Sequence, residues 1–403
     1  MPPNILWIVT TQWRAQACGY AGDANAPTPH LDAWAARSID YAQAVTPHPF
    51  GPFARAALLT GVPSPANGVR DYFDPLPGGA RTIAHDLGAA GYATAFFGKW
   101  HLGSRDAAAP LVGDAHARTL VPAGARGGFA VWDGFEGGFL LNDPWFHGHR
   151  SERPQPERGY QSDLVCRRAA EWIRGQRAPW FAVVSLEAPH PPYDAPAAGV
   201  AARDPAALAL PPNVPRGGEV ERRARRELAG YYAHIEATDR AIGRELLATV
   251  DEAAAVAITS VHGDMHGAHG LFRKGWPHEE SVRVPLLVRP PAHRGGGQRS
   301  AGPVSLLDLP RWARDWAAGR SATAPTGAAR ISMPSVVALP WQCDRVWSGW
   351  RTATHKLVFN ADGSPWLCFD LAADPFEQRN LAGDPSRADE FRRLRALLES
   401  AAI

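Results

Sequence analysis

The stretch NILWIVTT, residues 4–11, is an apolar run that ends in two threonines. A run without polar alternation is typical of a parallel strand that is covered on both faces. Further strands are predicted within residues 93–97, 179–190 and 254–261, and helical patterns lie between them. This alternation predicts an α/β fold with a large, mostly parallel central sheet flanked by helices.

The helical patterns have recognisable ends. Thr28 is the expected N-cap of one helix, because Pro29 follows it at the first helical position. Residues 219–249 place Leu228 and Ile235 on one apolar stripe, which predicts a long amphipathic helix. The segment 192–217 before that helix is rich in proline and alanine, and we expect it to form a surface excursion.

The last part of the chain has a different pattern. The segments RTATHKLVFN (351–360) and PWLCFDL (365–371) flank the turn ADGS, which predicts an antiparallel hairpin. Residues 386–401 predict a closing helix. We therefore expect an α/β domain over residues 1–334 and a small α+β subdomain, with an antiparallel sheet and a closing helix, over residues 335–403.

The composition excludes several classes of partner. The 403 residues include 42 Lys and Arg against 40 Asp and Glu, so neither nucleic acid nor an acidic membrane is expected to bind. The four cysteines form no CxxC pair, and no apolar run approaches the length of a membrane span. We expect a cytoplasmic protein that binds a small anionic ligand, with a homo-oligomer or a protein partner left open.

Polar side chains follow four of the predicted strands. Thr11 and Gln12 follow the first strand, Lys99 and His101 the second, His190 the third and His262 the fourth. Because ligands bind beyond the carboxyl ends of strands in open α/β sheets, we expect these side chains to converge on one site.

Seven segments in a fixed order resemble the sulfatase and phosphonate monoester hydrolase branch of the alkaline phosphatase superfamily. They include PNILWIVTTQWR (3–14), ARAALLTGVPSPANGV (54–69), TIAHDLGAAGYATAFFGKWHLG (82–103) and WLCFDLAADPFEQRNLA (366–382). The resemblance covers nearly the whole chain and implies an alkaline-phosphatase-like sandwich. It also implies a chemistry in which a Cys or Ser, oxidised to formylglycine, attacks a sulfate or phosphate ester beside a divalent metal.

The nucleophile position departs from this family pattern. Counting back from Arg55 in HPFGPFARAALLTG (48–61) places Gly51 at the position of the oxidised Cys or Ser, and a one-residue insertion would place Phe50 there. Neither side chain can become an aldehyde. The resemblance therefore implies that formylglycine catalysis is absent from this chain.

The metal-ligand positions depart from the pattern as well. The resemblance places the family ligands at Thr11, Gln12, Val261 and His262, where no carboxylate remains. Calcium, magnesium and manganese prefer charged oxygen ligands, so we expect no cofactor and no metal of this kind.

The family's anion-binding positions are retained. They are Arg55, Lys99, His101, His190 and Lys274. Since the metal-ligand carboxylates are missing, we expect these groups to repel one another unless water or an anion occupies the site.

Other polar clusters have weaker interpretations. His262, His266 and His269 suggest zinc, but intervening glycines argue against a helix that would align them. Trp145, Phe146, His147 and His149 could cover a ligand, although a surface loop is the simpler interpretation. Asp239 on the long helix is expected to cap or pair locally.

Our leading hypothesis is an anion-binding pseudoenzyme that is inactive as a conventional sulfatase. The alternative is an enzyme retooled for metal-independent lyase, isomerase or transfer chemistry, with His101, His190 or His262 as acid or base. A residual sulfuric or phosphoric ester hydrolase is the third hypothesis.

Overall fold

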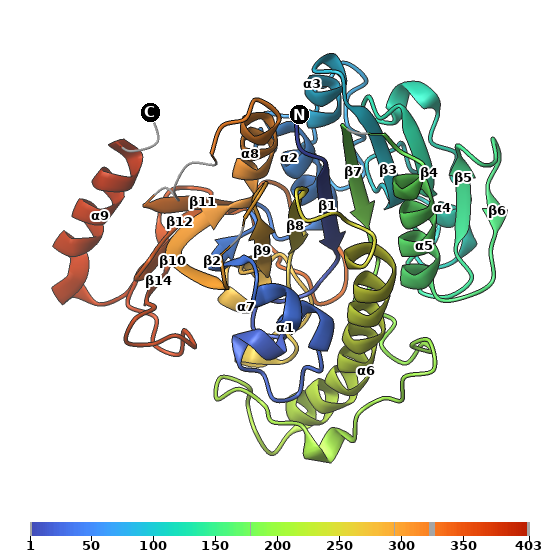
Figure 1. Ribbon diagram of the computed structural model, residues 1–403. Helices are drawn as coiled ribbons and strands as arrows, with labels where there is room; N and C mark the ends of the chain where they lie inside the picture. The colour runs from blue at the N-terminus through green and yellow to red at the C-terminus, as the bar shows by residue number, and fades with distance from the viewer. Residues whose placement is uncertain (1, 178, 294, 322–326, 401–403) are drawn as a thin grey trace.

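The computed structural model describes residues 2–177, 179–293, 295–321 and 327–400. Among these residues, ten strands form one sheet in the order β10-β2-β9-β8-β1-β7-β3-β4-β5-β6 (Figure 1). The central pairs from β8 through β4 are parallel, whereas β9 and β5 pair antiparallel with their neighbours. The predicted fold class is therefore confirmed. The strands are β1 Ile5–Thr10, β2 Ile39–Val45, β3 Ala93–Lys99, β4 Val131–Phe135, β5 Trp145–Gly148, β6 Gln155–Pro156, β7 Trp180–Ser185, β8 Ala255–Ser260, β9 Leu286–Arg289 and β10 Gln298–Ser305.

Strand β1 explains why the first apolar run is continuous. All six of its residues are buried, because β7 and β8 flank it and helices cover both faces. Trp7 and Val9 belong to the core on one face, whereas Leu6 and Ile8 belong to the core on the other. Successive side chains of a strand point to opposite faces, so a strand between two cores needs apolar residues at every position.

Helices cover both faces of the sheet (Figure 1). The α2, α3 and α8 side chains pack in one core, and those of α1, α5 and α6 pack in the other. In the described part of the chain, no helix combines the length with the apolar character needed to cross a membrane. The helices are α1 Pro29–Ala35, α2 Gly51–Thr60, α3 Ile83–Ala89, α4 Asp114–Ala117, α5 Gln161–Arg174, α6 Glu219–Ala241, α7 Glu279–Val282, α8 Leu309–Ala317 and α9 Ala388–Ser400.

The start of α1 depends on a distant carboxylate. Thr28 stands at the N-cap and Pro29 begins the helix, as predicted, but the Thr28 side chain makes no capping bond. Asp239 of α6 instead accepts hydrogen bonds from the backbone N–H groups of His30, at 3.0 Å, and Leu31, at 2.8 Å. Asp239 therefore acts as a cap, as expected, but the helix that it caps is the distant α1 and not a local one, so the contact ties α1 to α6.

Some elements differ from the sequence prediction. The helix predicted over 219–249 ends as an α-helix at Ala241 and continues as a π-helical turn over Ile242–Leu247. Strands β2 and β10 were not predicted. In β2 half-buried and buried positions are mixed, and the first five residues of β10 are exposed or half-buried, so neither segment is a continuous apolar run. Periodicity is a weak signal for such strands.

A second, four-stranded antiparallel sheet follows in the order β11-β12-β13-β14. The predicted hairpin is confirmed as β13 and β14. The small sheet begins at Ala328, before the predicted boundary at residue 335. Buried ion pairs join it to the main body: Glu279 of α7 lies 3.1 Å from Arg351 and 2.8 Å from Lys356. The four strands are β11 Ala328–Met333, β12 Trp347–Thr352, β13 His355–Asn360 and β14 Pro365–Asp370.

Candidate functional site

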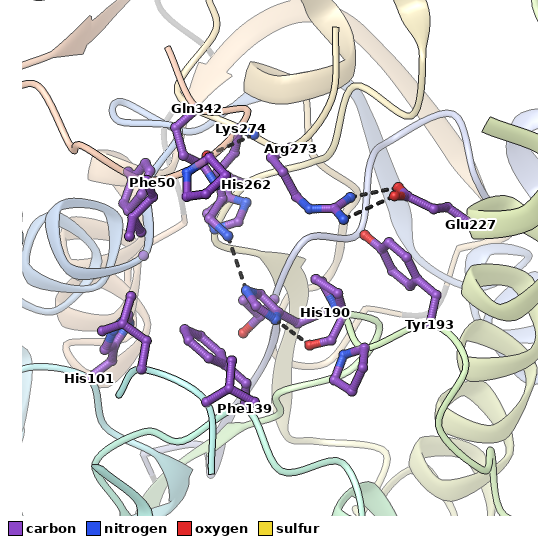
Figure 2. A pocket seen from close by; sticks show the side chains of 18 of the residues that line it. Phe50, His101, Phe139, His190, Tyr193, Glu227, His262, Arg273, Lys274 and Gln342 are labelled. Carbon is purple, nitrogen blue, oxygen red and sulfur yellow. Dashed lines mark hydrogen bonds and ion pairs between the residues drawn. The ribbon is translucent and has the colours of Figure 1, made fainter. Parts of the chain in front are cut away.

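A cavity of about 650 Å³ lies at the carboxyl ends of β1, β3, β7 and β8. Figure 2 shows His101, His190, His262 and Lys274 around this hollow, and Thr11 and Lys99 also line it. The structure thus brings together the polar residues that follow the four strands, as the strand-end rule predicts. These residues come from different parts of the chain, and they meet because the parallel strands that precede them end at the same edge of the sheet.

Gly51 leaves space beside His101. Gly51 is the first residue of α2 and Phe50 is its N-cap, and both are buried against the cavity. A Cβ atom at Gly51 would lie 2.8 Å from Nδ1 of His101. The Nε2 atom of His101 lies 2.7 Å from the Arg105 guanidinium, which can only donate, so Nδ1 carries the imidazole proton. This buried Nδ1–H has no hydrogen-bond partner among the described residues.

Lys99 is neutralised by a carboxylate that the sequence analysis did not identify. Its Nζ atom lies 2.6 Å from Oε1 of Glu187, and both side chains are fully buried. Burial lowers the pKa of Lys99 to about 8, and Glu187 limits that fall. Glu187 lies in the segment SLEAPH directly after β7, so its place at a strand end could have identified it.

Arg55 lies beneath the cavity and does not line it. Its guanidinium donates hydrogen bonds to the Thr11 hydroxyl, the Ser185 hydroxyl and the Lys99 carbonyl. Burial lowers the pKa of Arg55 to about 10. In this arrangement Arg55 holds the ends of β1, β3 and β7 together, and its predicted contact with an anion stays a prediction.

Lys274 is the cation of the cavity that lacks a carboxylate partner among the described residues. Its Nζ atom donates to Oε1 of Gln12 at 2.8 Å and lies 3.0 Å from Nε2 of His190. His190 donates from Nδ1 to the Pro191 carbonyl, so its Nε2 is a neutral acceptor for Lys274. Burial, together with the charge of Lys99, lowers the pKa of Lys274 to about 7.

The donor set at the family's metal-ligand positions does not fit a divalent metal. Thr11 accepts from Arg55 and donates to the Leu186 carbonyl, and Gln12 turns its oxygen toward the Lys274 ammonium. Val261 offers no side-chain ligand, and the cations Arg55 and Lys274 donate to Thr11 and Gln12, where a divalent ion would need carboxylates. At these four positions, Nε2 of His262 is the side-chain atom for which the described part of the chain offers no hydrogen-bond partner. Burial, followed by the charge of Lys274, holds the pKa of His262 well below 6.5.

The expectation of cations without compensating carboxylates was wrong. Five basic side chains stand in or beneath the cavity against four acidic ones, which is a formal excess of one positive charge, and burial raises the pKa of one of the acids, Glu136, to about 7. Arg105 lies 3.4 Å from Glu136, and Arg273 lies 2.6 Å from Glu227. Asp264 accepts from Gln12 and Tyr193. The cations are Arg55, Lys99, Arg105, Arg273 and Lys274, and the carboxylates are Glu136, Glu187, Glu227 and Asp264.

Several residues around the cavity have strained backbones. Gln12, His101, Phe139 and Arg273 all have φ between 54° and 71°, the left-handed region that non-glycine residues rarely adopt. Such conformations cost about 1–3 kcal/mol each and persist where the surrounding structure imposes them. Their clustering supports this cavity as the candidate functional site.

Histidines 266 and 269 do not join His262. His266 packs between Tyr193 and Tyr231, whereas His269 lies near Glu280 and Glu377. His269, Glu280 and Glu377 are the one group of three or more His, Cys, Asp or Glu residues in the described part of the chain whose possible metal-ligand atoms all lie within 4.8 Å of one another. The zinc interpretation of the histidine triplet therefore finds no common site.

The segment around residues 143–150 lies away from the cavity. Trp145–Gly148 forms strand β5 and not a loop. His147 is buried and lies 2.9 Å from the backbone nitrogen of Val121, so it stabilises the fold. None of Trp145, Phe146, His147 and His149 lines the cavity.

Comparison with known proteins adds independent information. A family model described as Sulfatase matches residues 3–319. An ulvan-active sulfatase of Formosa agariphila is 32% identical, over 95% of this chain and 78% of the relative. The phosphonate monoester hydrolase of Agrobacterium radiobacter superposes with a TM-score of 0.77 at 20% identity, covering 99% of this chain and 95% of that one. A sulfatase candidate, YidJ of Bacteroides fragilis, superposes with a TM-score of 0.84 at 23% identity, covering 100% of this chain and 96% of that one.

Proposed function

This chain belongs to the sulfatase family, and we propose that it uses the family's pocket to bind an acidic ligand without formylglycine and metal chemistry. The observation that carries the proposal is the environment of Gly51. No side chain is present there to attack a substrate, and a buried His101 N–H without a partner faces the same space.

Two features support anion binding. Lys274 offers an ammonium whose hydrogen bonds go only to neutral acceptors, so its charge is not cancelled by a direct partner. The His101 Nδ1–H offers a second donor to the same hollow. A buried donor without an acceptor is costly, and an anion oxygen would satisfy both groups.

Ordinary sulfate ester hydrolysis is the second candidate, because the relatives are named as sulfatases. It would need a water molecule to attack with neither the covalent nucleophile nor the metal. Enzymes lower such barriers by about 8 kcal/mol or more, and the described residues offer little to replace those two contributions.

A retooled enzyme is the third candidate, and His262 supports it. Its Nδ1 lies 2.9 Å from the Gly263 carbonyl, which leaves Nε2 as an unprotonated acceptor at the cavity. An imidazole in this state can act as a general base. Turnover of an acidic metabolite that is abolished in His262→Gln would favour this candidate over a pure binder.

The proposal is tested by thermal unfolding with inorganic sulfate, phosphate and acetate. We expect at least one anion to raise the melting temperature of the wild type and to have a much smaller effect on Lys274→Met. Arg222→Met is the matched control, because Arg222 is an exposed cation on α6 paired with Glu219. Equal stabilisation of all three proteins, or none in any, would contradict the proposal.

Hydrolysis is measured separately with 4-methylumbelliferyl sulfate, with and without added calcium or magnesium. We expect no release of fluorescent product under either condition. Metal-dependent release that is removed by a chelator would establish ordinary sulfatase activity and overturn the proposal.

A further inference from the structure

The cavity has an apolar wall beside the residues that would hold an acid. Phe50, Tyr72, Leu111, Phe139 and Leu339 line it. The volume of about 650 Å³ is far larger than a sulfate ion requires, and it lies in the range of pockets that enclose small organic molecules. Much of the cavity therefore offers surface to an apolar body and not to an anion.

Phe139 is held in place at an energetic cost. It adopts φ of 54°, which is unfavourable for an aromatic residue. Its ring stacks on the His190 imidazole with centroids 4.4 Å apart and planes 4° apart, and the Lys99 ammonium lies 4.6 Å from its centroid. The strained backbone keeps the ring in the cavity beside the cations, where a flat ligand could contact it (Figure 2).

The net charge around the cavity limits how many negative charges a ligand can carry. One formal positive charge is in excess in and beneath the cavity, and the mouth adds one residue of each sign, Arg226 and Asp194. The buried histidines contribute no charge, because burial first and neighbouring cations second hold the pKa of His101 and His190 well below 6.5. A second negative charge on a ligand would be buried without compensation.

From these three observations we propose that the ligand is a singly charged acid on an aromatic or similarly flat apolar body. Its acidic group, a carboxylate, sulfonate or sulfate ester, contacts Lys274 and the His101 N–H. Its apolar body lies against Phe139 and Phe50. This inference rests on the proposed function and narrows it to one class of ligand.

Three probes that share one ring system test the inference. They are 2-naphthalenesulfonate with one charge, 2-naphthyl phosphate with mostly two charges, and uncharged 2-naphthalenemethanol, compared at pH 6.5, where Lys274 is mostly protonated. Titration calorimetry should show the sulfonate binding about tenfold tighter than the phosphate ester, and no saturable binding of the alcohol. A phosphate ester that binds as tightly as the sulfonate, or an alcohol that saturates, would overturn the inference.

Phe139→Ala isolates the contribution of the apolar wall, with Phe139→Leu as the conservative variant. We expect Phe139→Ala to weaken sulfonate binding about tenfold, as the loss of an aromatic contact implies, while acetate, which carries one charge and no ring, still raises its melting temperature as in the wild type. An equal loss for both anions would refute the role of Phe139. If neither the small anions nor the naphthalene probes bind, the proposed function itself is wrong. If the anions bind but the naphthalene probes show no preference for a single charge, only this inference is wrong.

Discussion

Replacing Glu187 with Gln tests whether the Lys99–Glu187 pair is as buried as the structure indicates. The two charged atoms lie 2.6 Å apart, and the side chains are 1% and 0% exposed. Breaking a buried pair by removing one partner commonly costs about 3–5 kcal/mol, because the remaining charge stays desolvated. Lys99 can relieve part of this by losing its proton, since its pKa is already about 8, so we expect a loss near the lower end, about 3 kcal/mol.

The assay is the free energy of unfolding from urea denaturation at pH 7. Lys99→Met combined with Glu187→Gln should recover most of the loss, because no buried charge is then left without a partner. Arg222→Gln is the control: its pair with Glu219 at 2.9 Å is about two-thirds exposed, so its loss should stay below about 1 kcal/mol. A similarly small loss in Glu187→Gln, or a double variant less stable than the single one, would refute the reasoning.

Three further predictions follow from individual contacts. Binding of 2-naphthalenesulfonate, followed by calorimetry across pH, should weaken as pH rises above 7 and approach a tenfold loss per unit, because the Lys274 pKa of about 7 means that its charge is lost there; a flat profile up to pH 9 would contradict this. Gly51→Cys should lower the melting temperature without restoring hydrolysis of 4-methylumbelliferyl sulfate, since its Cβ would lie 2.8 Å from the His101 ring; turnover would refute our account of the site. Asp239→Ala should reduce the free energy of unfolding by about 1 kcal/mol through loss of the α1 cap, and an unchanged urea midpoint would show that the cap is dispensable.

The sequence determined the fold class and the position of the site. The continuous apolar run of β1 and the helical patterns between the strands are local signals, so they can be recognised from the sequence alone. The rule that parallel strands end at one edge then places His101, His190 and His262 together without any coordinates. The expectation that Gly51 stands at the family's nucleophile position also comes from the sequence, once the resemblance is recognised.

Only the tertiary structure decided how the charges are paired. Glu187 and Lys99 are 88 positions apart in the chain, and their contact depends on β3 and β7 being neighbours in register. The contact between Gln12 and Lys274 spans 262 positions. Periodicity reports which face of an element is apolar, but it carries no information about which distant side chain a buried charge meets. The net charge of the cavity depends on such pairs, because a buried charge is stable only beside its partner.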